Sequence, residues 1–153
     1  MSRFTDQTAA LPVLRDARGR LRILMVTSRD TGRWVLPKGW LIDGAKPWQA
    51  AEIEALEEAG AKGRVARERI GCYGYDKLLD DGSAVPCRVQ VYPMRVDKLK
   101  RVWKERRERS RRWFSFNAAA RRVAEADLAL LLRRLDDCES PEHARLVRVL
   151  DDA

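Results

Sequence analysis

A chain of 153 residues, 45% of them hydrophobic, is long enough to bury a core, so we expect one globular domain over residues 1–153 and exclude a disordered chain. The formal net charge of +8 favours polyanionic partners, which include phosphorylated metabolites, nucleic acid and acidic membranes. Three widely spaced cysteines and a single histidine argue against a zinc site. The first residues lack the pattern of a secretory signal, and no apolar run is as long as a membrane span. We therefore expect a cytoplasmic protein.

The segment before residue 45 predicts two paired strands followed by a loop. Residues 11–14 are apolar, and residues 21–26 are rich in β-formers and partly alternating, so each predicts a strand. The turn sequence at 16–19 would join these two strands as a hairpin. A brief apolar piece at 34–36 is ended by a proline, and we expect a loop over residues 39–44.

The middle of the chain predicts one helix and two long strands. Helix formers dominate residues 47–59, which begin with a proline suited to a first helical turn. Gly60 is suited to the C-terminal cap of this helix. Residues 65–75 and 85–96 predict strands, and the Asp-Asp-Gly sequence at 80–82 predicts the turn between them.

The last part of the chain predicts a short strand and three helices. Residues 112–116 are expected to form the strand, and residues 117–123 a helix capped by Asn117. A second helix is expected over 125–135, and Ser140-Pro141 would open a third. Because strands come mostly first, with one helix between them and the others at the end, we expect an α/β fold with a mixed β-sheet and helices on both faces.

Three glutamates of the predicted helix 47–59 form an acidic face. Glu54, Glu57 and Glu58 follow the i, i+3, i+4 spacing, so their side chains project together. Like charges at this spacing cost about 0.2–0.5 kcal/mol per pair, and the helix dipole disfavours anions near the end implied by Gly60. No lysine or arginine lies in this helix to offset them. Solvated glutamates on an exposed face are one explanation, and a hard divalent cation such as Mg²⁺ or Mn²⁺ is the other.

The opposite side of the same helix has the residues needed to pack on a sheet. Trp48, Ala55, Leu56 and Ala59 are expected there. The small alanines would let the helix axis lie close to the strands.

The loop before this helix and the acidic face together resemble the Nudix box. In that motif a glycine is followed by five residues, a glutamate, seven residues, Arg-Glu, an aliphatic residue, any residue, Glu-Glu, any residue and a glycine. The glycines and the last three glutamates of the motif stand at the required spacing, as Gly39, Glu54, Glu57, Glu58 and Gly60. Two positions depart from it: Ala45 replaces the first glutamate, which supports the metal site, and Ile53 replaces the arginine, which orients a ligand glutamate.

The resemblance implies an α/β/α sandwich that cleaves a diphosphate by water attack on phosphorus, with Mg²⁺ or Mn²⁺ as cofactor. Glu57, Glu58 and the carbonyl of Gly39 are the implied metal ligands. Glu54 is either a further ligand or the base that orients water. The family often uses one more carboxylate from a loop, and the candidates are Asp76, Asp80, Asp81, Glu105 and Glu108.

Segments outside the box are similar to the diphosphoinositol-polyphosphate and diadenosine-polyphosphate hydrolase branch of this family. They are residues 27–29, 33–40, 103–105 and 111–114. The resemblance implies that polar and basic side chains of these segments and of the following basic stretch bind substrate phosphates. The candidates are Ser28, Arg29, Arg33, Lys38, Arg109, Arg111 and Arg112.

Residues 98–112 contain nine lysines and arginines and allow three interpretations. The first is a solvated segment, which is usual for a run of charge. The second is a loop that holds substrate phosphates, which we favour for its last three arginines. The third is non-specific binding of nucleic acid, with Trp103 and Trp113 as stacking partners.

The expected function is that of a metal-dependent hydrolase acting on a nucleoside-diphosphate-linked or dinucleoside polyphosphate substrate. A catalytically weak nucleotide-binding module of the same family is one alternative, and Ala45 and Ile53 would favour it. An RNA 5′-end pyrophosphohydrolase is the other, which the basic charge would favour. The expected partner is therefore a small phosphorylated molecule or an RNA 5′ end, and not a membrane.

Overall fold

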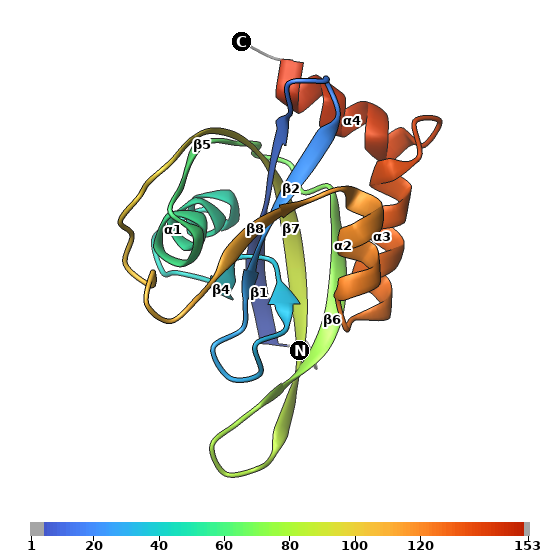
Figure 1. Cartoon of the computed structure of the whole chain (residues 1–153). Coiled ribbons are helices and arrows are strands. Elements are labelled where there is room, and N and C mark those ends of the chain that lie inside the picture. The colour runs from blue at the N-terminus through green and yellow to red at the C-terminus, as the bar shows by residue number, and fades with distance from the viewer. Residues whose placement is uncertain (1–4, 152–153) are drawn as a thin grey trace.

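The computed structural model describes residues 5–151, which form one eight-stranded mixed sheet with four helices (Figure 1). The strands are β1 (Thr5–Arg15), β2 (Leu21–Thr27), β3 (Trp34–Val35), β4 (Lys38–Trp40), β5 (Ala61–Val65), β6 (Gly71–Leu78), β7 (Ala84–Leu99) and β8 (Arg111–Phe114). The helices are α1 (Pro47–Ala59), α2 (Phe116–Arg122), α3 (Ala126–Asp136) and α4 (Pro141–Asp151).

Two long strands, β1 and β7, run parallel through the centre of the sheet, in register from Thr5↔Cys87 to Val13↔Arg95. Residues 7–13 of β1 are buried without interruption, as expected for a strand covered on both faces. On its other edge β1 pairs with β4 and then with β2, both antiparallel. The outer edge of β7 carries β5 and β6, also antiparallel.

Helices cover both faces of this sheet, which confirms the expected α/β/α sandwich. Helix α1 lies on one face and α2, α3 and α4 lie on the other (Figure 1). On the first face, Ala51, Ala55 and Ala59 pack against residues such as Leu24 and Met94. The small alanine side chains let the helix lie close to the strands, as the sequence predicts.

Several predicted elements match the structure. The helix over 47–59 has the expected bounds, and Gly60 ends it in the left-handed conformation, at φ 63°. The hairpin of β1 and β2 turns at residues 16–19 as expected, with Gly19 at φ 78°. The predicted helix over 125–135 is observed as α3, with Glu125 as its N-cap.

The prediction of one strand over residues 65–75 was wrong. Strand β5 ends at Val65 and β6 begins at Gly71, although both pair with β7. The break lies opposite Pro93 of β7, whose carbonyl accepts a hydrogen bond from Ala66 N at 2.9 Å. Proline has no N–H to donate back toward that edge, so the antiparallel ladder cannot continue across it.

Smaller corrections concern three other positions. Part of the expected loop 39–44 belongs to strand β4, because residues 38–40 pair with β1. Helix α2 is capped by Ser115 and not by Asn117, since the Ser115 hydroxyl accepts a hydrogen bond from Ala118 N at 3.1 Å. Leu56 is 37% exposed, so it does not join the packed side of α1. Within residues 5–151, no helix combines the length and the apolar character that crossing a membrane requires.

Candidate active site

The acidic face of α1 lies beside the short strand β4. Glu58 is buried, with 6% of its surface exposed, and its Oε1 accepts a hydrogen bond from Lys38 N at 3.2 Å. A side chain at Gly39 would overlap the carboxylate of Glu54, so a larger residue there would displace that carboxylate. The expected convergence of the box glycine with these two glutamates is therefore observed.

The ladder between β1 and β4 decides which backbone groups face the glutamates. Ala10 N donates to Pro37 O, so by alternation Gly39 directs its N–H and carbonyl toward Thr8 of β1. Lys38 directs both groups to the other edge, and its N–H meets Glu58 there. The backbone carbonyl on the side of Glu58 is therefore that of Lys38, one residue before the expected ligand.

Glu54 and Glu58 lie so close that they do not both ionise readily. Burial raises the pKa of Glu54 to about 8, and the charge of Glu58, a hydrogen bond with Glu58 and the charges of Glu57 and Glu105 act in the same direction. Burial also raises the pKa of Glu58, although Arg109 and the Lys38 N–H oppose it. Without a cation the pair therefore retains a proton near neutral pH.

Glu57, the third acidic residue, is in a different environment. Its carboxylate is about one third exposed, and its Oε1 lies 3.4 Å from Lys104 Nζ, which is itself 69% exposed. Glu57 therefore lies at the solvent edge of the acidic face, whereas Glu54 and Glu58 lie inside it.

Arg109 holds Glu58 from the segment between β7 and β8. Its side chain is 8% exposed, and its NH2 lies 3.2 Å from Glu58 Oε2. Its Nε bonds Glu105 at 2.9 Å, and its NH1 donates to Thr27 O at 2.9 Å. Ile53, at the arginine position of the box, is 38% exposed, so the cation that contacts the acidic face comes from a distant segment instead.

The same segment closes the C-terminal end of α1. The carbonyl oxygens of residues 57–60, which no further helical turn could satisfy, each accept a hydrogen bond from it, at 2.8–3.0 Å. Glu105 N donates to the carbonyl of residue 57 and Trp103 Nε1 to that of residue 58. Arg111 NH1 donates to the carbonyl of residue 59 and Lys100 N to that of residue 60. The Arg111 guanidinium also lies over the Trp103 ring, 3.9 Å from its centre, and its charge suits the negative end of the helix dipole.

The oxygen-rich pair fits a hard cation. Among the described residues, no three acidic, histidine or cysteine side chains form a closed metal-binding group. Mg²⁺ does not need such a cage, because it usually binds one or two carboxylates together with substrate phosphates and water. Glu54 and Glu58, crowded and partly protonated beside the Lys38 backbone, are a donor set of this kind.

Of the five candidates for an additional carboxylate, the structure brings Glu105 closest to the acidic face. Glu105 contacts Arg109, and its charge acts on the pKa of both Glu54 and Glu58. Asp80 and Asp81 lie at the tip of the β6–β7 hairpin, which extends away from α1 (Figure 1). Asp76 lines a recess on the opposite side of the sheet, and Glu108 is exposed.

The candidate phosphate-binding residues fall into four groups. Arg109 and Arg111 are engaged with the protein, as described above. Arg112 lies over the Phe114 ring, which belongs to the core on the α2–α4 face, so it points away from α1. Arg29 remains exposed, with its Nε 3.8 Å from Glu105 Oε1. The remaining three, Ser28, Arg33 and Lys38, line the recess that also contains Asp76.

Sequence reasoning missed Tyr75, Lys77 and Glu125, which line this recess with them. They come from β6 and from the start of α3, so no short sequence motif connects them to the box. Glu125 was expected only as the first residue of a helix.

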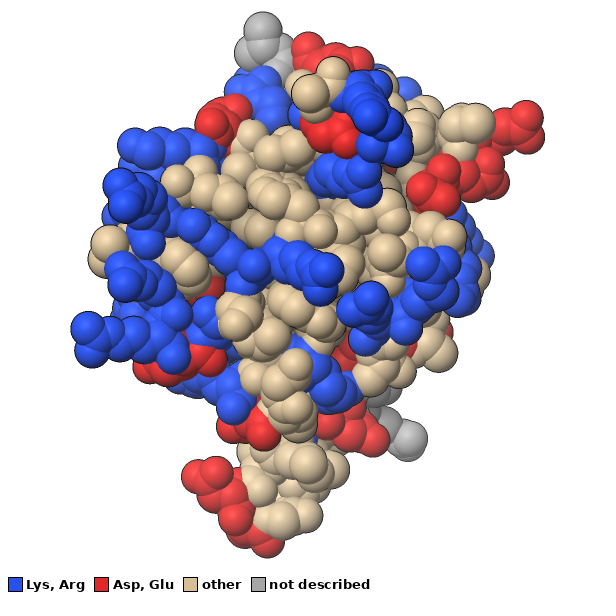
Figure 2. Space-filling view, in the orientation of Figure 1, with Lys and Arg blue, Asp and Glu red and all other residues tan. Residues whose placement is uncertain are grey.

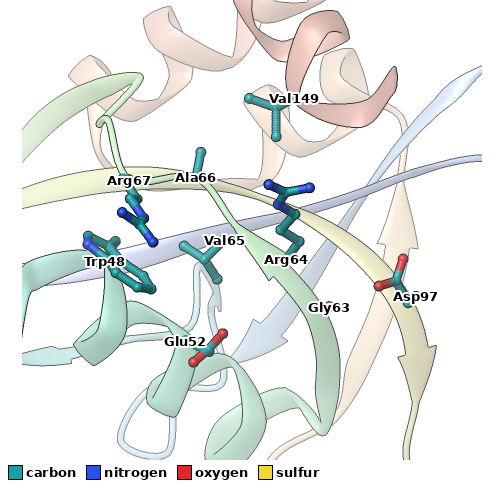
Figure 3. A pocket seen from close by; sticks show the side chains of 9 residues that line it. All are labelled: Trp48, Glu52, Gly63, Arg64, Val65, Ala66, Arg67, Asp97 and Val149. Atoms are coloured by element: carbon teal, nitrogen blue, oxygen red, sulfur yellow. The ribbon is translucent and has the colours of Figure 1, made fainter. Parts of the chain in front are cut away.

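Other charged and hollow regions lie apart from the acidic face. Figure 2 shows lysines and arginines gathered over the side of the molecule where α1 and the β7–β8 segment lie, and acidic residues at the tip of the β6–β7 hairpin. A hollow of about 480 Å³ lies next to Trp48, and the Arg67 guanidinium lies 5.2 Å from the centre of the Trp48 ring. Figure 3 shows the side chains that line this hollow. This hollow includes Glu52 and none of the three glutamates of the acidic face, so it is separate from the candidate active site.

Comparisons with known proteins identify the family of the chain. The NUDIX domain family matches residues 5–135. Nudix hydrolase 12, mitochondrial, of Arabidopsis thaliana is 31% identical over 103 residues, which cover 65% of this chain and 51% of that protein. Diphosphoinositol polyphosphate phosphohydrolase 3-alpha of Homo sapiens is 27% identical over 130 residues, covering 84% of this chain and 67% of that protein.

The fold is also found in solved structures. The crystal structure of C. elegans Ap4A hydrolase superposes with a TM-score of 0.67 at 17% identity, covering 94% of this chain and 98% of that one. The chain spans about half the length of the plant relatives that it matches. The family match covers most of the sequence and includes all three glutamates of the acidic face, so the chain belongs to the Nudix family.

Proposed function

We propose that this protein is a metal-dependent hydrolase that cleaves a diphosphate linkage in a nucleoside-diphosphate-linked or dinucleoside polyphosphate substrate. The observation that carries the proposal is the Glu54–Glu58 pair, crowded against Gly39. Such crowding is unfavourable by itself and becomes favourable when a divalent cation and a diphosphate occupy the site. One relative is named a Nudix hydrolase and another a diphosphoinositol polyphosphate phosphohydrolase, and these names support a hydrolase function.

A bound Mg²⁺ or Mn²⁺ would polarise phosphoryl oxygens and neutralise the charge of the leaving phosphate. Glu58, fixed by Lys38 N and Arg109, and the Lys38 carbonyl would hold the ion, with Glu57 as a ligand from the solvent edge. The absence of a side chain at Gly39 leaves room for the Glu54 carboxylate beside them.

Glu54 is the residue best suited to accept the proton of the attacking water. Glu57 pairs with Lys104 and Glu58 pairs with Arg109, whereas no ion pair among the described residues engages the Glu54 carboxylate. The water oxygen forms the new bond to phosphorus, the anhydride P–O bond breaks, and the leaving phosphate carries away the electron pair. Arg29, exposed beside Glu105, is placed to bind a substrate phosphate at the edge of the site.

A panel of substrates tests the proposal. Phosphate release from diadenosine tetraphosphate, ADP-ribose, a diphosphoinositol polyphosphate and 5′-triphosphate RNA should be measured with Mn²⁺ and with EDTA. We expect cation-dependent turnover of the nucleotides. Turnover of the RNA alone would favour the 5′-end pyrophosphohydrolase, and binding without turnover would favour the nucleotide-binding module that Ala45 and Ile53 suggest.

A matched pair of variants tests the site itself. Glu54→Gln should lower kcat by roughly 100-fold or more, because a general base contributes about 10²–10⁴-fold. Glu52→Gln removes an exposed carboxylate from the other side of the same helix and should leave kcat unchanged. Equal activity in the two variants would refute the assignment of Glu54.

A further inference from the structure

The hollow beside Trp48 adjoins a second hollow of about 260 Å³, and Ala66, Arg67 and Val149 line both of them. The two lie where the connection between β5 and β6 passes helix α4 (Figure 3). Neither contains a glutamate of the acidic face, so this surface is separate from the candidate active site. The larger hollow, at about 480 Å³, lies within the roughly 300–1,000 Å³ typical of a site for a small molecule.

The smaller hollow is lined mainly by basic side chains. Arg67 comes from the β5–β6 connection, and Arg145 and Arg148 come from α4, whereas Glu68 is the single acidic residue in this lining. Arg145 NH2 donates to Arg69 O at 2.6 Å, which ties α4 to the connection. The arginines belong to segments far apart in the sequence, so the fold and not a local run of charge brings them together.

Two of these arginines have guanidinium groups without a polar partner. Arg67 lies over the Trp48 ring, and Arg148 is exposed. Among residues 5–151 neither makes an ion pair or a hydrogen bond, although the exposed Glu68 lines the same hollow. A guanidinium is a planar set of donors that matches phosphate oxygens, and the contact with Trp48 restricts the orientation of Arg67 before any ligand binds.

The larger hollow has a different character. Its basic side chains are matched by two acidic ones, Glu52 and Asp97, while Trp48, Val65 and Val149 add apolar surface. Figure 3 shows Trp48 and Arg67 together at one end of this hollow and Asp97 at the other. An anionic group would gain little from such a balanced lining, whereas an uncharged ring can pack beside the Trp48 side chain.

We infer that the two hollows form an accessory binding site for a phosphorylated ring compound of the size of a nucleoside monophosphate. The phosphate would lie between Arg67 and Arg148, and the ring would lie beside Trp48. Because Arg67 lines both hollows, one ligand can occupy the two at once.

The accessory site binds without hydrolysing its ligand. Arginines supply the positive charge, so no metal ion is needed, and the three glutamates of the acidic face are absent from it. The inference therefore goes beyond the proposed function and does not depend on it.

Isothermal titration calorimetry with AMP in EDTA tests the inference. Arg148→Ala should weaken AMP binding about 10-fold, the effect of losing one hydrogen bond between charged groups, and Arg67→Ala should weaken it at least as much. Inorganic phosphate and adenosine should each bind to the wild type roughly 10-fold more weakly than AMP, because each fills one hollow. The matched control is Arg101→Ala, which removes the same charge from the exposed segment at the other end of α1 and should leave the affinity within about twofold.

NMR chemical shifts locate the bound ligand. In the wild type, AMP should shift the backbone amide signals of residues 66–67 and 148–149. Thermal unfolding should show that Arg148→Ala remains folded, since this side chain makes no polar contact with residues 5–151. No AMP binding to the wild type, equal affinity in Arg148→Ala, or shifts confined to β4 and residues 54–58 would overturn the inference. Absence of turnover in the substrate panel would contradict the proposed function and leave these binding results unchanged.

Discussion

The acidic face of α1 and the basic segment between β7 and β8 have opposite charges, and the structure uses the two very differently. The glutamates converge, because one helix face carries them and Gly39 leaves room for the Glu54 carboxylate. The basic residues diverge: Arg109 and Arg111 are tied to backbone and carboxylate groups, while neighbours such as Lys104 extend into solvent. A run of like charge in a sequence can thus contain structural and solvated residues side by side, and burial distinguishes them.

Replacing a buried basic residue of this segment should have the largest effect on stability. Arg109→Ala leaves Glu58 and Glu105 without their shared cation, so we expect the free energy of unfolding to fall by about 3 kcal/mol. Urea denaturation measures this change. Arg107→Ala, an exposed neighbour, should alter stability by less than about 0.5 kcal/mol. Similar values for both variants would show that the buried contacts contribute little.

Metal affinity should depend on pH through the acidic face. Burial and the neighbouring carboxylates raise the pKa of Glu54 to about 8, so a cation must displace a proton at lower pH. We expect Mn²⁺ to bind roughly 10- to 100-fold more weakly at pH 5.5 than at pH 8. Electron paramagnetic resonance of free Mn²⁺ gives the affinity directly. Equal affinity at the two pH values would contradict the description of the Glu54–Glu58 pair.

The Glu54 carboxyl should make the metal-free protein less stable as pH rises. The pKa of Glu54 is raised in the folded protein from its ordinary value of 4.5, so the folded state holds this proton more tightly than the unfolded state. Stability contributed by the proton is complete below pH 4.5 and is lost as pH rises through 8. In EDTA at pH 9, Glu54→Gln should therefore be more stable than the wild type by about 1 kcal/mol, after allowance for solvent screening. Melting curves at pH 4 and pH 9 test this, since the gain should be absent at pH 4.

Replacing an exposed basic residue of this segment should have the smallest effect on stability. Lys104 and Glu57 form an ion pair at 3.4 Å, but both side chains are partly or largely exposed. Lys104→Ala should change the free energy of unfolding by less than about 0.5 kcal/mol, and added salt should reduce even that. A loss comparable with that of Arg109→Ala would mean that exposure is a poor guide to which basic residues matter.

Local sequence signals predicted the acidic face of α1 better than they predicted the residues that contact it. Pro47 and Gly60 mark the ends of α1, and the helical spacing places the three glutamates on one face, so both were predictable from 14 consecutive residues. The contact from Arg109 to Glu58 spans about fifty residues, and no periodicity in the sequence reports it. Local reasoning treated the helix as lacking a neutralising cation, whereas the fold supplies one.

The same limit explains the errors in the fold. The hairpin of β1 and β2 was predictable because its turn and strands are adjacent in the chain. The break between β5 and β6 depends on Pro93 in the opposite strand, so residues 65–75 alone do not reveal it. The recess that Glu125 lines combines separate segments of the chain, so it becomes visible only in three dimensions.

The last turn of α1 depends on donors that come much later in the chain. Trp103 and Arg111, which satisfy two of its carbonyl oxygens, lie 45 and 52 residues beyond the residues that they bond. Bringing such distant segments together requires β7 to be in place first, which is a slow, non-local step in folding. The C-terminal end of the helix is therefore completed only when residues far along the chain have come into place.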